Sequence, residues 1–416
     1  MATPLTVLQS QSYTNFNCIH KDCEDNCCGG WGIVIDKRTF DTYRECTDAE
    51  LRPIMDSNVD VIDGTPNDMA YAQIKLEHDR CPFLSESLRC RIHEKLGESA
   101  LSRACSTYPR AVNLVDGVLE CSLYMSCPEA VRVVLLDPDS MALEASVRSQ
   151  ALRFASPPSL DTKDRKYTNK PYEHFPAVRD LVTSILRNRN YALWERLLIL
   201  GFFCDHLDRV IAANDGASVG DMVAGYAAQI EEGLFAGAFK DVPYQPIEQI
   251  NFVTKWIDAR AADGTLNPRF VTTCDEFKKG IDVGSIDGGA AAYVDAATRY
   301  YEPFVDANPH IIENYLHNYM FKALFPFGPQ KSLYFEQKSV FTEYVLLVVH
   351  YAIVRSLLIG SAAYHREAFG EAQVVTVVQS FSKAIEHNLP FLKRILGFLE
   401  NRNLNSMVYM AALTRG

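Results

Sequence analysis

Four cysteines crowd into eleven positions near the start of the chain, and this cluster limits what the N-terminal part can fold into. Cys18, Cys23, Cys27 and Cys28 follow the spacing C-x4-C-x3-C-C, and two glycines come directly after them. Ten of the twelve cysteines lie within the first 130 residues. Thiols at such short spacings predict either a disulfide framework or a loop that wraps a metal or an iron–sulfur cluster.

The segment before the cluster helps to choose between these two structures. MATPLTVLQSQSYTN has neither the basic stretch nor the apolar core of a secretory signal. We therefore expect a cytoplasmic, reducing location, where a cysteine cluster is typical of metal ligation. We interpret the four remaining cysteines as small buried apolar residues: Cys46, Cys121, Cys204 and Cys274.

The neighbouring pair Cys27 and Cys28 is awkward for a single tetrahedral zinc, because adjacent side chains point in different directions. A polynuclear cluster or two separate sites tolerates that divergence better. The candidate metal ligands are Cys18, Cys23, Cys27, Cys28, Cys81, Cys90, Cys105 and Cys127. These eight thiols could form two four-ligand sites or one cluster with spare thiols, and the spacing does not choose between them. A structural zinc module is the alternative.

Charge and hydropathy exclude other classes. The net charge is −11 and no basic block occurs, so the chain lacks the electrostatic signature of a nucleic-acid-binding protein. The longest apolar run, from Tyr344 to Gly360, is interrupted by His350 and Arg355. It predicts a buried core helix rather than a membrane span. Peripheral association with a membrane stays compatible with this composition.

The pattern along the chain predicts a mainly α-helical fold. We expect a cysteine-rich metal or iron–sulfur region over residues 1–130 with few short strands, and a multi-helix body over 131–416, with a polar linker or surface loop near 156–176. Strands are expected at 31–36 and at 112–124, the latter as a hairpin around Asp116 and Gly117. Apolar residues at helical spacing predict helices within 128–154, 175–188, 191–213, 219–235, 246–262, 311–325, 341–360, 371–388 and 391–403.

Several blocks carry a resemblance to a known family. NCIHKDCEDNCCGGWGIVIDKRTFDTY, LRCRIHEKLGESALSRACSTYPR and LECSLYMSCPEAVRVVLL, with WERLLILGFF, IIENYLHNYMFKALFPF and VQSFSKAIEHN in the helical half, resemble the flagellin lysine-N-methylase family. The cysteine region of that family belongs to the wider zinc- or iron-chelating CxxCxxCC group. The resemblance implies transfer of a methyl group from S-adenosylmethionine to lysine ε-amines on flagellin. It also implies an iron–sulfur cluster, of the 4Fe-4S type, as cofactor.

The residues do not reveal how S-adenosylmethionine binds. The nearest approach to a Rossmann-type glycine-rich turn, residues 280–293, follows no buried strand and is expected to be a surface loop. The spacing C-x3-C-x2-C, typical of radical enzymes that use this cofactor, is not matched either. The chemistry of the methyl transfer, polar or radical, is therefore open.

Transfer to lysine by a polar route needs a group that removes a proton from the ammonium. Glu313, Asn314 and His387 lie in the polar helical blocks of the family and are our candidate catalytic residues, although hydrogen bonds between packed helices would explain the same residues. We expect the acceptor lysine to bind between the cysteine region and the helical body. The competing functions are a non-enzymatic zinc-binding scaffold and an iron–sulfur redox or sensor protein.

Overall fold

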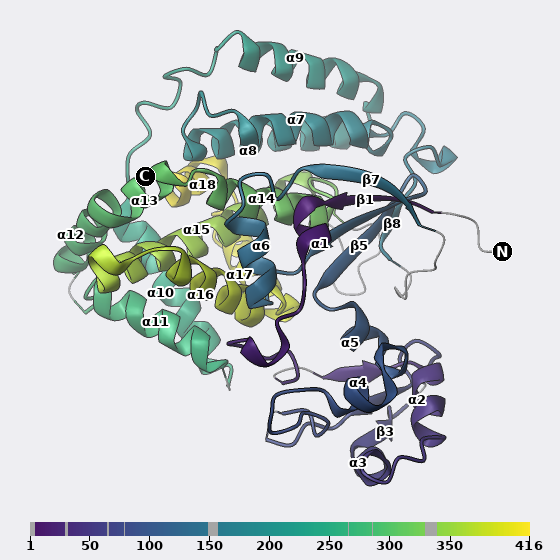
Figure 1. Cartoon of the computed structure of the whole chain (residues 1–416). Coiled ribbons are helices and arrows are strands. Elements are labelled where there is room, and N and C mark those ends of the chain that lie inside the picture. The colour runs from purple at the N-terminus through teal and green to yellow at the C-terminus, as the bar shows by residue number, and fades with distance from the viewer. Residues whose placement is uncertain are drawn as a thin grey trace.

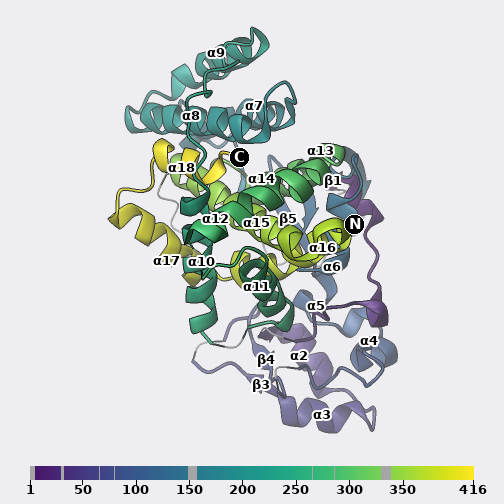
Figure 2. The ribbon, with the colours of Figure 1, turned by 90° about the vertical axis from the view of Figure 1, so that its left-hand side faces the viewer.

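The computed structural model describes residues 5–29, 32–64, 66–78, 80–148, 157–264, 266–284, 286–328 and 339–416. A large body of helices flanks a five-stranded sheet, and a small lobe rich in cysteine hangs below it (Figure 1). The view turned by 90° shows the same two parts, with the lobe beneath α11 and α16 (Figure 2). The predicted mainly α-helical fold is confirmed.

The sheet belongs to the body although most of its strands come from the cysteine-rich third of the chain. Its strands are β1 (Leu5–Ser10), β5 (Arg110–Val115), β6 (Val118–Leu123), β7 (Leu143–Arg148) and β8 (Ser159–Leu160), in the order β7-β1-β6-β5-β8. β1 runs parallel to β6 and antiparallel to β7. The predicted hairpin is confirmed: Asp116 and Gly117 turn the chain with φ of 49° and 81°, the positive values that a tight two-residue turn requires.

Helices make up the rest of the body. They are α1 (Gln11–Asn15), α6 (Pro128–Leu135), α7 (Phe175–Arg187), α8 (Leu193–Ala212), α9 (Val219–Glu231), α10 (Pro246–Ala262), α11 (Pro268–Gly280), α12 (Ile286–Ala296), α13 (Glu302–Ala307), α14 (His310–Ala323), α15 (Val340–His365), α16 (Glu371–Phe381), α17 (Leu389–Asn401) and α18 (Met407–Thr414). Two segments, Ala297–Tyr301 and Ser382–Glu386, are π-helical. Eight of these helices coincide with the ranges predicted from 175 onward.

α15 is the central helix of the body. It is apolar enough, at a mean hydropathy of 1.9, and long enough to cross a membrane, but that stretch is entirely buried in the protein. α11 crosses it closely, because a Cβ at Gly360 would lie 2.5 Å from Cδ2 of Phe277 and one at Gly280 would lie 2.4 Å from the Gly360 oxygen. The predicted buried core helix is confirmed.

Three expectations about the connections need correction. The helical pattern over 128–154 is wrong beyond α6, since the chain then turns back as β7, and residues 149–154 lie outside the described part. The loop expected at 280–293 is wrong in its second half, where α12 forms. Residues 157–176 are an ordered connection rather than a free linker: they contribute β8, and Leu160 and Tyr167 are buried in the main core.

The lobe has an apolar core of its own. It contains β2 (Ile33–Ile35), β3 (Val59–Val61) and β4 (Ala72–Ile74), in the order β2-β4-β3, with α2 (Lys37–Arg44), α3 (Leu51–Asn58), α4 (Arg91–Leu96) and α5 (Arg103–Thr107). The predicted strand within 31–36 is present as β2. The two apolar cores do not separate at residue 130: the lobe core runs from Ile33 to Ala100, whereas β1, β5 and β6 pack into the main core.

Candidate metal centre and adjoining polar site

All twelve cysteines lie in the described part of the chain and are free thiols. Four of the eight predicted ligands lie where the lobe meets the body, and we call them the junction thiols: Cys18, Cys23, Cys27 and Cys127. Burial raises the pKa of Cys127 to about 12, and the charges of Cys23 and Cys27 raise it further. Burial likewise raises the pKa of Cys18, with a contribution from Cys27. These four thiols are therefore electrostatic neighbours.

The other four predicted ligands lie inside the lobe, and we call them the lobe thiols: Cys28, Cys81, Cys90 and Cys105. The amide of Cys81 donates a 2.7 Å hydrogen bond to the Cys28 carbonyl. Cys28, Cys90 and Cys105 pack against the apolar core that contains Cys81. Burial raises the pKa of Cys105 to about 12, and the charges of Cys81 and Cys90 add to this effect.

Backbone amides point at several of these sulfurs. Each of Cys81, Cys90 and Cys127 accepts hydrogen bonds at sulfur from the amides two and three residues farther along, which lower the thiol pKa against the larger effect of burial. Amide donors of this kind stabilise thiolates that bind metals. Cys204 and Cys274, in the middle of α8 and α11, have no such donors among the interactions that shift their pKa values. The contrast agrees with interpreting those two residues as apolar packing.

The spacing of the thiols bears on the kind of metal group that they fit. Among the described residues, no three side chains of Cys, His, Asp or Glu are gathered closely enough to hold one metal ion. A single zinc ion draws its sulfurs to about 2.3 Å from one point. A polynuclear cluster keeps its ligands farther apart, because iron and sulfide lie between them. The all-thiol donor set suits both, and this spacing suits the cluster better.

Asp25 fixes the loop of the junction thiols to the helical body. Its carboxylate accepts hydrogen bonds from Nε2 of Gln379 at 2.6 Å and from Nδ2 of Asn267 at 3.1 Å, and Nζ of Lys383 lies 2.8 Å away. Lys383 also acts on Cys27: the hydrogen bond with the Cys28 thiol lowers the pKa of Cys27 to about 7, and the Lys383 charge lowers it further. The helical body thus sets both the position and the charge of this loop.

His387 and Ser126 form the polar site beside the junction thiols. Nε2 of His387 lies 2.8 Å from Oγ of Ser126, which is also 3.0 Å from the Tyr108 hydroxyl. The His387 ring packs on Tyr124, and its partial burial lowers the pKa of the imidazole. The residue as a whole is nevertheless exposed at the surface. A neutral imidazole is therefore accessible from solvent one residue away from Cys127.

A buried ion pair lies next to this site. Lys322 and Glu386 are paired, with side chains only 12% and 8% exposed. The Lys322 ammonium lies 5.0 Å from the centre of the Tyr124 ring. Burial alone would raise the pKa of Glu386, but the Lys322 charge lowers it to about 2. Glu386 closes the π-helical segment, a local deviation that is frequent at functional sites.

The other two candidate catalytic residues have structural partners. Glu313 is bound by Arg189 at 2.7 Å and Arg196 at 2.8 Å, which overcome its burial and lower its pKa. Nδ2 of Asn314 donates to the carbonyls of Val134 and Asp137 at the end of α6. Nine residues of α14 separate Glu313 from the Lys322 pair, about 13 Å along the helix axis. The structure therefore brings His387 to the junction but not Glu313 or Asn314, whose catalytic role stays a prediction.

The site contains residues that the sequence did not single out. Asp25, Ser126 and Lys383 join the thiols to the body. The only signal in the sequence was the position of Asp25 between two of the clustered cysteines. Ser126 and Lys383 carry no comparable signal, because their partners lie more than 250 positions away.

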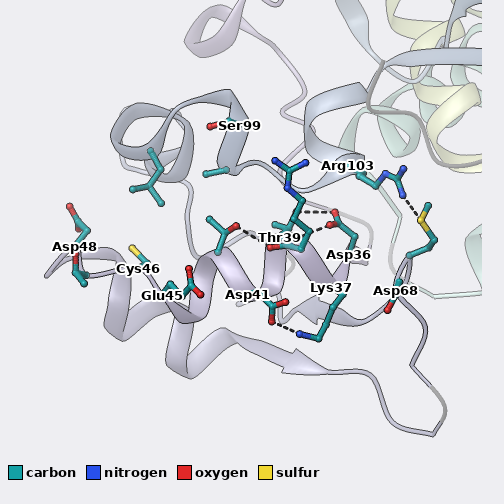
Figure 3. A pocket seen from close by; sticks show the side chains of 16 residues that line it. Asp36, Lys37, Thr39, Asp41, Glu45, Cys46, Asp48, Asp68, Ser99 and Arg103 are labelled. Carbon is teal, nitrogen blue, oxygen red and sulfur yellow. Dashed lines mark hydrogen bonds and ion pairs between the residues drawn. The ribbon is translucent and has the colours of Figure 1, made fainter. Parts of the chain in front are cut away.

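The largest cavity, about 1510 Å³, lies on the lobe rather than at the junction (Figure 3). Asp36, Asp41, Glu45, Asp48 and Asp68 line it. Local partners engage three of these carboxylates: Asp36 caps α2, Asp41 pairs with the neighbouring lysine, and Asp48 caps α3. The cavity therefore carries no free constellation that would favour chemistry there, and the junction stays the better candidate.

Comparisons with known proteins agree with the motifs. A sequence profile of the FliB lysine N-methylase C-terminal domain matches residues 179–413, more than half of the chain. The flagellar biosynthetic protein FliU of Salmonella muenchen is 38% identical over 141 residues, 33% of this chain and 82% of that protein. The lysine-N-methylases of Salmonella choleraesuis and Salmonella typhimurium are each 30% identical over 234 residues, 55% of this chain and 54% of theirs.

The alignments thus span about half the length of these lysine-N-methylases. No solved structure matches the chain. The profile match and the extent of FliU that is covered confirm the family that the sequence blocks indicate: this chain belongs to the flagellin lysine-N-methylase family, FliB.

Proposed function

We propose that this protein methylates lysine ε-amines on flagellin, with S-adenosylmethionine as the methyl donor and an iron–sulfur cluster, of the 4Fe-4S type, held by the junction thiols. Family membership supports lysine methylation. The flagellar name of the FliU relative supports a flagellar substrate. Twelve free thiols support a reducing, cytoplasmic location.

One observation carries the choice of site: the exposed His387 binds Ser126, and Ser126 directly precedes the junction thiol Cys127. A side chain that reaches from another protein must find its partner at the surface, and Cys18, Cys27 and His387 are all exposed. The site also lies between the lobe and the body, where binding sites are frequent.

The chemistry of the acceptor explains the role proposed for His387. Lysine has a pKa of about 10.4, so its ammonium must lose a proton before the nitrogen can attack. The lowered pKa of His387 keeps its imidazole neutral at pH 7, and the ring nitrogen can take that proton. In a polar transfer the amine lone pair then forms the N–C bond. The donor's C–S bond breaks at the same time, and its electron pair stays on sulfur.

The junction thiols would hold the cluster. Thiolates bind such clusters, and the amide donors at Cys127 and the positive charge of Lys383 near Cys27 favour the thiolate form there. A bound iron–sulfur cluster supplies a redox-active group and, when one iron lacks a protein ligand, a binding position for a substrate or cofactor. Asp25, held by Gln379 and Lys383, would keep this loop in place when the cluster is bound.

The test is methylation by the whole protein, purified without oxygen. We expect flagellin incubated with it and S-adenosylmethionine to gain methyl groups on lysine, detected by mass spectrometry of its peptides. Colourless protein that contains zinc and leaves flagellin unchanged would instead identify a scaffold. Coloured protein that leaves flagellin unchanged would identify a redox or sensor protein.

A matched pair of histidine variants tests the site. His387→Ala should lower methyl transfer at least tenfold with unchanged iron content, because only the proton acceptor is removed. His206→Ala is the control, since His206 is also exposed and also packs on a tyrosine, Tyr226. Equal activity of the two variants at saturating substrates would place the acceptor site elsewhere.

A further inference from the structure

The peptide bond between Cys27 and Cys28 separates two groups of thiols. We propose that the lobe thiols, Cys28, Cys81, Cys90 and Cys105, form a second all-thiolate metal centre, distinct from the one at the junction. This proposal concerns residues outside the site assigned to methyl transfer, and it can stand or fall without the proposed function.

The backbone places Cys28 with the lobe and not with the junction. Its carbonyl accepts the 2.7 Å hydrogen bond from the Cys81 amide, and its amide donates at 2.7 Å to Oδ1 of Asn26. Its side chain packs against the lobe core, whereas the exposed Cys27 packs against neither core. Cys127 packs against the main core. Each group therefore belongs to a different part of the molecule.

Local structure holds the other three lobe thiols in place. The amide of Leu84 donates to the Cys81 carbonyl at 3.0 Å, and Leu84 and Cys90 form an antiparallel bridge, which closes the loop between the two cysteines. Oγ of Ser102 accepts from the Cys105 amide at 3.1 Å and fixes the start of α5. Turns of this kind, with amides directed at the sulfurs, position thiolates before a metal binds.

The lobe also needs a centre of this kind for its stability. Its three strands have only three residues each. Its buried apolar core contains eleven side chains, from Ile33 to Ala100. Domains with so small a core commonly depend on a structural metal or on disulfides. All of its cysteines are free thiols, so a metal is the means that remains.

The donor set defines the ligand class. Four thiolates without a carboxylate select a thiophilic group, a zinc ion or an iron–sulfur cluster, and disfavour calcium and magnesium. Cys46 provides an internal control. It packs against the same core but lines the cavity on the α2 side, with no hydrogen bond to any of the lobe thiols.

The experiment measures iron, sulfide and zinc per chain in the full-length protein and its variants. Cys81→Ser with Cys90→Ser should lose the metal of the lobe centre. That loss is about half of the iron if both centres are clusters, or all of the zinc with iron retained if the lobe holds zinc. Cys18→Ser with Cys23→Ser should lose only junction metal, and Cys46→Ser should lose none.

Alkylation of the wild-type protein decides the matter even if a variant fails to fold. Cys81, Cys90 and Cys105 should react with iodoacetamide at least tenfold faster after a chelator removes the metal, while Cys46 reacts at an unchanged rate. Unchanged rates at the three lobe thiols would overturn the proposal. So would a folded Cys81→Ser, Cys90→Ser variant that keeps its full content of both metals. Neither result would touch the proposed methyl transfer, which is read out separately on flagellin.

Discussion

Nε2 of Gln379 donates a 2.6 Å hydrogen bond to the carboxylate of Asp25, and the same nitrogen donates at 3.0 Å to the carbonyl of Ser126. One amide group thereby joins the cysteine loop to the residue that carries His387. Nε of Arg269 donates at 3.0 Å to Oε1 of Gln379 and holds that side chain in its orientation. The thiols and the polar site are thus connected through a single side chain of α16.

Asp25→Ala should loosen the junction without unfolding the body. The change leaves Lys383 without its partner and removes three hydrogen-bond acceptors' worth of contact from Asn267 and Gln379. We expect the junction iron to fall at least twofold and amide exchange around Cys23 and Cys27 to become faster. Asp22→Ala, at an exposed position on the same loop, is the control. Identical iron content in the two variants would show that the contact does not hold the loop.

Asn314→Ala should act on stability rather than on catalysis. The amide group of Asn314 satisfies the carbonyls of Val134 and Asp137, and leaving them unpaired in the interior costs about 1–3 kcal/mol of unfolding free energy. Denaturant unfolding measures this loss. The remaining folded protein should methylate flagellin at the normal rate. A large loss of activity with unchanged stability would instead support the catalytic role expected from the sequence.

Glu343 should make the protein less stable as pH rises from mildly acidic to neutral. Burial raises the pKa of this carboxyl to about 7, and no ion-pair partner for it is found among the described residues. Below about pH 4.3 the group is protonated in both the folded and the unfolded chain. Above that pH the unfolded chain loses the proton first, so the unfolding free energy falls by about 3 kcal/mol until pH 7 and then levels off.

Glu343→Gln should remove this part of the pH dependence. The difference in unfolding free energy between pH 5 and pH 8 should be smaller in the variant, by up to the same roughly 3 kcal/mol. Denaturant titrations of both proteins at the two pH values provide the measurement. Parallel pH profiles would mean that Glu343 is ionised in the folded protein.

Gly360→Ala should destabilise the body where α11 crosses α15. The new methyl group would lie 2.5 Å from a ring carbon of Phe277 and 2.7 Å from its Cα, so the two helices must move apart. Overpacking of this kind costs about 1–3 kcal/mol. Gly397→Ala, on α17 with open space around the added atom, should be neutral or stabilising. Thermal unfolding of the two variants distinguishes a steric effect from a general effect of helix glycines.

The sequence predicted local structure well where one rule dominated. Apolar residues at helical spacing located eight body helices, and Asp116-Gly117 located the hairpin. β1 and β7 were missed, because β1 lies at the centre of the sheet beside strands from residues 118–148, and no local pattern shows that pairing. α12 was missed because its glycines and alanines resemble a loop.

The site shows the same division. The cysteines were evident because thiols at short spacing are unusual, but their partition into two groups depends on tertiary structure. Glu313 stood out as a polar residue in an apolar helix, which is equally the pattern of a buried ion pair, here with Arg189 and Arg196. Asp25 and Gln379 look like ordinary surface residues until the chain folds and brings them together.

The lobe is inserted between two elements of the sheet region: the chain leaves the body after α1 and returns to it as β5 (Figure 1). A part attached at both ends cannot swing freely, as a terminal domain on one linker can. Its easiest movement is a rocking about the line between its two attachments, and Asp25 is the contact that resists it. A protein substrate that enters between lobe and body would therefore meet a hinge with a single axis, opened or closed by the grip on one carboxylate.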